Sequence, residues 1–336
     1  MYLNRTGDII DCMNRYGKMR SPFLFAISYD MQEAYLFPVA ELNRTEDVLY
    51  DFGGNTNTRA IVKRNYVSPV LIARPVSFVR YKRSFDIVHR NLLRGNSFLT
   101  NLTCATPVQC NLSANEIFYR SKAPYKLYIK GRFVVFSPET FVRIQNGMIS
   151  SYPMKGTIDA SLPNARERIL GDVKESAEHA TIVDLIRNDL SRVATQVEVS
   201  RYRYIDLVNT SNGDLLQVSS EIKGRLEGYY NERLGDILFS LLPAGSITGA
   251  PKKKTMEIIA EAETCPRGFY TGVMGYFDGF DLDSAVMIRF MEIRETGFLF
   301  KSGGGITAKS RAEAEYNEMK QKIYVPICRN LTDTGW

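Results

Sequence analysis

The spacing of apolar residues divides the chain into segments with helical and with strand periodicity. From Phe78 to Leu93 apolar residues recur every three or four positions, which predicts an amphipathic helix that ends at Arg94-Gly95. The same spacing predicts later helices at 163–171, 173–194, 232–241, 251–263 and 311–323. Short apolar or β-branched runs between turn residues predict strands at 23–29, 35–39, 98–103, 197–208, 215–226, 270–277, 284–293 and 298–301.

Residues 125–152 predict a meander of antiparallel strands. Their short β-rich runs are separated by Gly131-Arg132, Pro138-Glu139 and Asn146-Gly147, which are typical of turns. Strands therefore come in hairpin-like groups, with helices between the groups. This order favours an α+β fold with antiparallel sheets over a doubly wound parallel sheet.

Composition limits the classes of function. The 336 residues are 44% hydrophobic and 24% charged, which is ordinary for a soluble globular protein. No apolar run is long enough to span a bilayer, and the N-terminal residues lack the apolar core of a signal peptide. The five cysteines are scattered, which argues for a reducing cytoplasm and against a zinc site. The net charge of +6 contains no long basic run, so we expect a cytoplasmic protein with neither nucleic-acid nor membrane partners.

Lys155 stands in the segment Ser151-Tyr-Pro-Met-Lys-Gly-Thr157, after a predicted strand and inside a Pro…Gly turn. A lysine held by rigid backbone can act as a nucleophile or a base when its pKa is lowered. Most lysines beside turns are solvated surface residues, so this position gains meaning only from the motifs around it.

Two predicted helices each carry a pair of glutamates three residues apart. Glu175 and Glu178 lie on one, and Glu315 and Glu318 lie on the other, followed by Lys322. Residues with this spacing share a helix face, so the two pairs could hold one hard cation. Mg²⁺ fits, because it prefers few carboxylates together with water and substrate oxygens. For either pair alone, a solvated helix face is the better interpretation.

Two glycine-containing segments could bind an anion. Gly303-Gly304-Gly305 follows a predicted strand, and its backbone N–H groups either face a ligand or form a mobile hairpin tip. Gly245-Ser-Ile-Thr-Gly-Ala-Pro-Lys252 starts a helix and places Lys252, Lys253 and Lys254 at its positive end, which suits a nearby anion or else a solvated lysine run. Its glycine spacing does not match a nucleotide-binding P-loop.

Three further positions are polar within apolar surroundings. Arg289 lies in a predicted strand and needs an anionic partner, either a ligand or a structural salt bridge. His179 follows Glu178 and is either a substrate contact or an ordinary core residue. The cluster that ends the helix at Asp189, with Asp184, Arg187 and Asn188, is expected to be a structural polar network.

Together with Ser137-Pro138-Glu139, these motifs resemble the chorismate-utilising enzymes, in that family's order and over about residues 70–326. The resemblance implies a single large α+β domain, as in component I of anthranilate synthase and aminodeoxychorismate synthase. Residues 1–65 would be a short strand and loop region integrated in the fold, 66–328 the chorismate-binding catalytic core and 329–336 a C-terminal tail. Lysine at 155 is typical of aminodeoxychorismate synthase component I, whereas anthranilate synthases usually have alanine there.

The resemblance also implies a role for each motif. Glu139 would protonate the departing C4 hydroxyl of chorismate, and Lys155 would attack C2 before ammonia adds at C4 and expels the lysine. The product would be 4-amino-4-deoxychorismate, a precursor of p-aminobenzoate and folate, and ammonia would come from a separate glutamine amidotransferase subunit. Mg²⁺ would bridge the ring carboxylate to Glu178 and Glu318, with Glu175 and Glu315 acting through water. Contacts to chorismate are expected from Gly156, Thr157, His179, Ser246, Thr248, Gly249, Tyr270, Arg289, Gly303, Gly304, Gly305 and Lys322.

The chain departs from the family pattern at four positions. Met154 replaces isoleucine, which conserves volume. Leu99 stands where relatives have glutamine or a water-activating lysine, and an apolar side chain disfavours water addition at C2. Phe290 and Lys309 replace threonine and aspartate. Two alternatives stay open: anthranilate synthase component I, against which Lys155 argues, and a non-catalytic binding subunit of the same fold, against which the retained glutamates and lysines argue.

Overall fold

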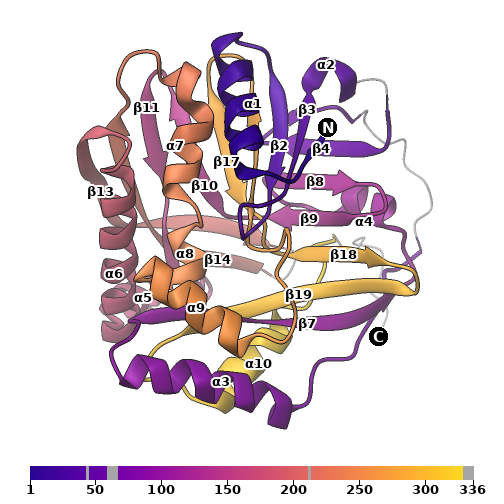
Figure 1. Ribbon diagram of the computed structural model, residues 1–336. Coiled ribbons are helices and arrows are strands. Elements are labelled where there is room, and N and C mark those ends of the chain that lie inside the picture. The colour runs from indigo at the N-terminus through magenta and orange to yellow at the C-terminus, as the bar shows by residue number, and fades with distance from the viewer. Residues whose placement is uncertain (43–44, 59–66, 211–212, 328–336) are drawn as a thin grey trace.

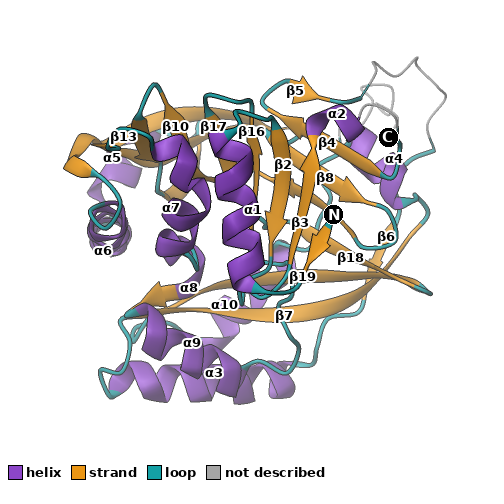
Figure 2. Ribbon diagram, turned by 45° about the horizontal axis from the view of Figure 1, so that its top comes forward, coloured by secondary structure: helices purple, strands orange, loops and turns teal. Residues whose placement is uncertain are grey.

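Two antiparallel sheets form the body of the protein (Figures 1 and 2). The computed structural model describes residues 1–42, 45–58, 67–210 and 213–327. Within these ranges one sheet has ten strands and the other has nine, and every pair of neighbouring strands is antiparallel. The predicted α+β class with antiparallel sheets is confirmed.

The ten-stranded sheet joins the N-terminal strands to the middle of the chain. In spatial order its strands are β1 (Tyr2–Leu3), β3 (Ala34–Pro38), β2 (Phe23–Ile27), β16 (Val273–Phe277), β17 (Leu282–Val286), β10 (Thr140–Gln145), β11 (Met148–Ser151), β14 (Gly213–Arg225) and β12 (Met154–Asp159), with β13 (Thr195–Thr210) paired to β14.

The nine-stranded sheet contains the two long strands that cross the lower half of Figure 2. In spatial order its strands are β15 (Gly249–Ala250), β7 (Leu99–Cys110), β19 (Gly297–Ile306), β18 (Phe290–Arg294), β9 (Phe133–Ser137), β8 (Tyr125–Ile129), β4 (Val48–Phe52) and β5 (Asn55–Thr56), with β6 (Leu71–Ala73) paired to β7.

Helices cover the outer faces of both sheets (Figure 2). Helices α1, α6, α7 and α8 share an apolar cluster with the ten-stranded sheet, while α3, α9 and α10 pack against β7 and β19. The helices are α1 (Thr6–Lys18), α2 (Val39–Leu42), α3 (Phe78–Leu93), α4 (Ala114–Arg120), α5 (Ala165–Gly171), α6 (Val173–Leu190), α7 (Leu234–Leu241), α8 (Gly245–Thr248), α9 (Lys252–Ala262) and α10 (Ala312–Gln321), with a 3₁₀ turn η1 (Tyr230–Arg233) before α7.

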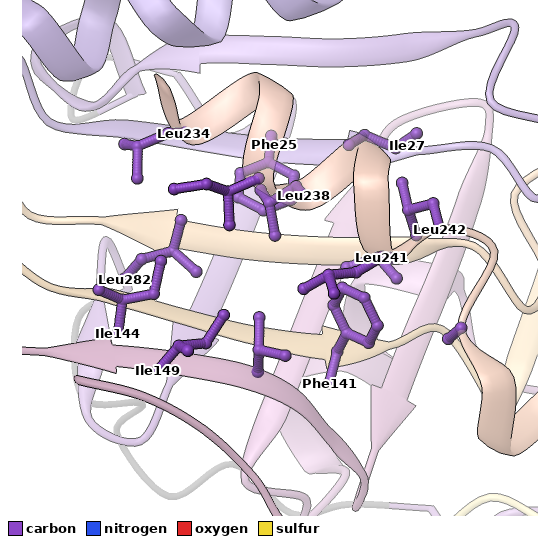
Figure 3. Packing of buried hydrophobic residues seen from close by; sticks show 14 of the residues in the cluster. Phe25, Ile27, Phe141, Ile144, Ile149, Leu234, Leu238, Leu241, Leu242 and Leu282 are labelled. Atoms are coloured by element: carbon purple, nitrogen blue, oxygen red, sulfur yellow. The ribbon is translucent and has the colours of Figure 1, made fainter. Parts of the chain in front are cut away.

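Strand β2 shows why its sequence, Phe-Leu-Phe-Ala-Ile, is apolar at every position. Successive side chains of a strand point to opposite faces. Phe25 and Ile27 pack on the face covered by α7, where Figure 3 shows them with Leu238 and Leu241. Leu24 and Ala26 belong instead to the core between the two sheets. Both faces of this strand are buried, so both sets of side chains contribute to stability.

Two of the places where the chain passes from one sheet to the other contact each other. Pro138-Glu139 connects β9 to β10, and 287–289 connects β17 to β18. The backbone N–H of Val286 donates to the carbonyl of Glu139 at 3.1 Å, and that of Phe136 donates to the carbonyl of Arg289 at 3.2 Å. The two crossings therefore place Glu139 and Arg289 side by side.

Several sequence predictions are corrected by these crossings. The meander over 125–152 is antiparallel as predicted, but its strands divide between the two sheets. The strand predicted over 284–293 is wrong, because it is two strands separated by the second crossing. Arg289 therefore lies in the connection and not in a strand. Of the two alternatives left open at Gly303–Gly305, the mobile hairpin tip is wrong, because these glycines continue strand β19.

The N-terminal region differs from the predicted strands and loop by two helices, α1 and α2. Helix α1 begins after Arg5, whose side chain makes no capping hydrogen bond, so the usual start signal is missing from the sequence. The proposed domain boundary near residue 65 and the proposed tail at 329–336 lie outside the described residues. Cys12, Cys104, Cys110 and Cys265 are free thiols. No helix among the described residues has the length and apolar character needed to cross a membrane.

Candidate active site

Glu139 occupies the first crossing, at the edge of the inter-sheet core. The hydroxyl of Ser246, in the short helix α8, donates to its Oε1 at 2.6 Å. Burial raises the pKa of the Glu139 carboxyl, and the bond from Ser246 and the charges of Arg289 and Lys322 partly offset this rise. A carboxyl with a raised pKa is suited to donate a proton. The predicted residues Glu139, Ser246, Arg289 and Lys322 are thus neighbours in the fold.

Lys155 faces the first glutamate pair. Strand β12 carries Lys155, whose Nζ lies 2.7 Å from Oε2 of Glu178 on α6. Burial lowers the pKa of the Lys155 amine, but Glu178, Glu175 and Glu318 together raise it, and the net shift is upward. The amine is therefore protonated at neutral pH in this arrangement. The lowered pKa that a nucleophilic lysine needs is not present while Glu178 is its partner.

The second glutamate pair lies over strand β19. A Cβ added to Gly304 would be 3.4 Å from Oε1 of Glu318 and 3.6 Å from Oε2 of Glu315. Lys322, which caps α10, places its Nζ 2.7 Å from Oε1 of Glu318 and donates to the carbonyl of Gly303 at 2.9 Å. A side chain at position 304 would thus enter the space in front of these carboxylates, which explains why glycine suits this position.

All four glutamates therefore converge on one region, as the helical spacing predicted. Among the described residues, no three histidine, cysteine or acidic side chains are arranged to hold a metal ion by themselves. Mg²⁺ is usually bound by one or two protein carboxylates, with water and substrate oxygens completing the shell. The donor set of Glu178 and Glu318, each held by a lysine, fits such a shared site and does not fit a closed protein cage.

The strand of three glycines exposes one backbone edge. Strand β18 pairs with β19 only as far as Lys301, whereas β7 continues to pair with it through Ile306. Beyond Lys301 the edge of β19 that faces away from β7 has no strand partner in the described residues, and the Gly303 carbonyl on that edge accepts from Lys322. Gly303 to Gly305 can therefore offer backbone groups to a ligand, although not as a mobile tip.

Arg289 and Tyr270 lie at the second crossing. Arg289 has a backbone φ of +54°, which is strained for a residue with a side chain. Its Nε is buried without a hydrogen-bond partner in the described structure, and its guanidinium lies 5.1 Å from the centre of the Tyr324 ring. Burial raises the pKa of the Tyr270 hydroxyl. An unpaired buried arginine donor is costly, so an anionic ligand would stabilise it.

His179 is buried next to Glu178, and its ring contacts strand β14. Its Nε2 lies 2.6 Å from the hydroxyl of Ser220, and its Nδ1 is buried without a partner among the described residues. Burial lowers the pKa of His179 to about 4, with smaller contributions from Arg203 and Lys155. The ring is therefore neutral near pH 7. Ser220 also donates its backbone N–H to the carbonyl of Pro153, two residues before Lys155, and no sequence pattern predicts this link.

The remaining predicted contacts divide into two kinds. Gly156 lies in the site, with φ of +82° and a Cβ position 3.4 Å from Oε2 of Glu175, and Thr248 is buried with an unpartnered hydroxyl. Gly249 has a structural reason for its identity, because φ is +116° and a Cβ would collide with the carbonyl of Leu99. Thr157 is exposed on β12 and pairs with Gln217 across the ladder, so the structure gives it no contact with the other site residues.

The departures from the family pattern lie in different environments. Leu99 is half-buried at the start of β7, next to Gly305. Phe290 is buried between the sheets against Phe133, so it replaces a core position. Lys309 is exposed in a turn.

Two of the three lysines at the start of α9 pair with carboxylates of the protein, so the run is neither a fully solvated cluster nor an open site for an anion. Lys252 pairs with Asp189 of α6 at 2.7 Å and donates to the carbonyl of Leu241 at 2.7 Å, while Lys254 pairs with Glu257. Asp189 and Asp184 of the same helix therefore have different partners, because Asp189 pairs with Lys252 and Asp184 pairs with Arg187. The sequence pattern did not reveal the link between Asp189 and Lys252.

Known proteins resemble this chain in sequence. The profile of the family described as chorismate binding enzyme matches residues 25–327. An uncharacterized PabA-like protein of Pasteurella multocida is 48% identical over 94% of this chain and 97% of its own length. Anthranilate synthase component 1 of Acetivibrio thermocellus is 36% identical over 92% of this chain and 64% of its own. Aminodeoxychorismate synthase component 1 of Bacillus subtilis is 27% identical over 88% of this chain and 67% of its own.

Solved structures share the fold. Anthranilate synthase component I of Streptococcus pneumoniae superposes with a TM-score of 0.67 at 28% identity, covering 76% of this chain and 59% of the other. The menaquinone-specific isochorismate synthase of Escherichia coli superposes with a TM-score of 0.75 at 15% identity, covering 96% of this chain and 82% of the other, which is a likeness of fold alone.

Proposed function

Because the chain belongs to the family of chorismate binding enzymes, we propose that it replaces the C4 hydroxyl of chorismate by ammonia and releases 4-amino-4-deoxychorismate. One observation carries the proposal: the Nζ of Lys155 lies 2.7 Å from Oε2 of Glu178 and feels the charges of Glu175 and Glu318, although its side chain is 31% exposed. A lysine at this position distinguishes the aminodeoxychorismate branch in the resemblance described above. The proposed substrate, held by the glutamates, would lie beside this amine.

The charged side chains suit a substrate with two carboxylates. Arg289, with its unpartnered Nε, and Lys322 provide cations on one side, and the free edge of β19 provides backbone groups. Bound Mg²⁺ would supply positive charge to the ring carboxylate and to Glu178 and Glu318. Lys155 would then lose the partners that raise its pKa, and burial would favour its neutral, nucleophilic form.

Glu139 would act as the general acid of the reaction. The hydroxyl of Ser246 fixes Oε1, which leaves the other oxygen to carry the proton. That proton would go to the C4 oxygen as the C4–O bond breaks and Lys155 adds at C2. Ammonia would then add at C4 and expel the lysine, so that one difficult displacement becomes two steps.

Ammonia is proposed to come from a separate glutamine amidotransferase. The chain has two histidines; His179 bonds to Ser220 and His89 to the carbonyl of Ala308, and no bond from either to a cysteine is present among residues 1–42, 45–58, 67–210 and 213–327. A glutaminase nucleophile of the cysteine–histidine type is thus not built from these residues. Glutamine should support turnover only when the partner is added, whereas ammonium salts should support it without the partner.

The test is a product assay with chorismate, Mg²⁺ and ammonium, analysed by mass-resolved chromatography with and without an aminodeoxychorismate lyase. The proposal expects p-aminobenzoate only when the lyase is present. Anthranilate formed without the lyase would contradict it.

Anthranilate synthesis is the second candidate, and one observation favours it. The anthranilate synthase relative is 36% identical to this chain, against 27% for the aminodeoxychorismate synthase relative. The same assay separates the two, because the products differ in mass and in their need for the lyase.

A further inference from the structure

A recess lies behind Glu139, between the ten-stranded sheet and helices α6, α7 and α8. Glu139 and Ser246 line it, together with Asp189 of α6. It offers about 30 Å³ to molecules of the size of water. One buried water needs about 10 to 15 Å³ on this measure, so two waters fit.

Asp189 gives the recess a second acidic group. Lys252 is its one ion-pair partner in the described part of the chain, and it contacts Oδ2 at 2.7 Å. The Asp189 side chain remains 14% exposed, so solvent can exchange protons with it. Burial raises the pKa of the Asp189 carboxyl, and the Lys252 charge partly offsets this rise.

The rest of the wall is mostly apolar. Phe141, Leu190, Leu241 and Ala244 line the recess, and Figure 3 shows Leu241 of α7 above Phe141 of β10. Waters in this space can bond to the two carboxyl groups, to the hydroxyls that also line it (Thr140, Ser151, Tyr152 and Ser246) and to each other. A mostly apolar recess with two acidic groups in its walls favours a short hydrogen-bonded chain of waters between those two groups.

We infer that two water molecules in this recess connect Glu139 with Asp189 and return a proton to Glu139 after each turnover. This inference rests on the proposed role of Glu139 as the general acid. Glu139 gives its proton to the C4 oxygen, the C4–O bond breaks with both electrons staying on oxygen, and water leaves. One recess water then protonates the Glu139 carboxylate, the second replaces that proton, and Asp189 supplies one taken from solvent. The net change is one proton moved from solvent to Glu139.

Positively charged side chains lie near both carboxyl groups, Glu139 and Asp189, but are not part of the proposed chain of waters. Arg289 and Lys322 act on Glu139, and Lys252 and Arg192 act on Asp189. The proposed route runs through the waters and the two carboxyl groups. Asp189 is therefore a positioning and relay residue and does not touch substrate.

The first test is Asp189→Asn, with loss of chorismate as the readout. Asparagine keeps the volume and the hydrogen bonding but cannot relay a proton. We expect kcat to fall about tenfold or more, since proton transfer by a positioned group contributes at least that much, with KM unchanged. The solvent deuterium isotope effect on kcat should rise, because reprotonation becomes slow. The control is Asp184→Asn on the same helix, where the acid pairs with Arg187 on the surface and kcat should not change.

A second variant and a crystal structure keep the inference testable if Asp189→Asn folds poorly. Ala244→Val narrows the recess and leaves both acids, and it should lower kcat and raise the isotope effect in the same direction. A high-resolution crystal structure should show waters bridging Glu139 and Asp189. A dry recess, or an unchanged isotope effect in both variants, would overturn the inference. Because the assay follows chorismate loss, a different amine product would refute the proposed function and leave this result standing.

Discussion

Two lysine–carboxylate pairs in this protein have the same length and opposite effects on the lysine. Lys155 lies 2.7 Å from Glu178, and Lys252 lies 2.7 Å from Asp189. Burial lowers the pKa of both amines, yet the net pKa of Lys155 is raised and that of Lys252 is lowered. Distance between partners therefore does not decide the outcome.

The surroundings explain the difference. Lys155 also feels Glu175 and Glu318, so negative charge exceeds positive charge around it. Lys252 has one carboxylate, and Arg192 opposes it. The first region carries an excess of negative charge, which could bind a further cation and, through that cation, an anionic substrate. In the second region the charges are balanced, and the ion pair links α9 to α6. We therefore assign substrate and cation binding to the first pair, whereas the ion pair of the second stabilises the packing of α9 on α6 and holds Asp189 beside the recess.

The largest expected effect is the loss of activity in Lys155→Ala. If the amine forms the adduct at C2, aminodeoxychorismate formation should fall by about two to four orders of magnitude, as for other groups that act directly on the reacting atoms. The measurement is the steady-state rate with ammonium at saturating chorismate. Lys223→Ala, an exposed lysine paired with Glu198, is the matched control and should keep full activity. An undiminished rate in Lys155→Ala would mean that the covalent role is wrong.

Lys252→Met should damage stability more than any other single change at the two pairs. It leaves Asp189 buried without its cation, and breaking a buried pair from one side costs about 3 to 5 kcal/mol. Urea denaturation measures the loss in the free energy of unfolding. Lys254→Met, two residues along the same helix in an exposed pair with Glu257, should leave this quantity unchanged. The double change Lys252→Met and Asp189→Leu should recover much of the loss, and a Lys252→Met protein as stable as the wild type would remove the contrast between the pairs.

The buried His179 beside the first pair should make stability depend on pH. Its pKa is about 4 in the folded protein and about 6.5 when unfolded, so the unfolded chain binds more protons between these values. Stability is full above about pH 6.5 and is lost as pH falls toward 4, by up to about 3 kcal/mol. Urea denaturation of wild type and of His179→Gln at pH 7 and pH 4.5 should give a smaller difference for the variant. The same change at His89 serves as the control, and equal pH dependence in all three proteins would contradict the assignment.

The sequence predicted the local elements better than the joins between them. Helix α3 begins and ends where its pattern predicts, because Ser77 caps its start and Arg94-Gly95 ends it. The strand predicted across 284–293 failed because periodicity does not tell which sheet a strand enters. The positive φ of Arg289 is set by that crossing and has no local sequence signal.

In the candidate site, too, local spacing could be predicted from the sequence, whereas contacts between distant elements could not. Glutamates three residues apart had to share a helix face, so their convergence could be expected from the spacing once both helices were matched to one motif set. The pairing of Asp189 with Lys252 spans 63 residues of sequence and depends on how α6 and α9 meet, which the pattern does not encode. The link from His179 through Ser220 to the backbone before Lys155 is tertiary in the same way.

The smallest effect is expected from Gly304→Ala, which alters the space around the glutamates near Lys155 and leaves every charge in place. In Gly304→Ala the new methyl group would meet Glu318 and Glu315 at ordinary contact distances and Lys322 at 3.7 Å, so folding should be little affected. The methyl would occupy space in front of the carboxylates, and KM for chorismate should rise about tenfold, which is the effect of about 1.4 kcal/mol of lost binding. Gly171→Ala, where nothing lies within 4 Å of the added Cβ, should leave KM unchanged. If both variants bind chorismate equally by calorimetry, the substrate does not lie over β19, and the excess negative charge around Lys155 must serve another ligand.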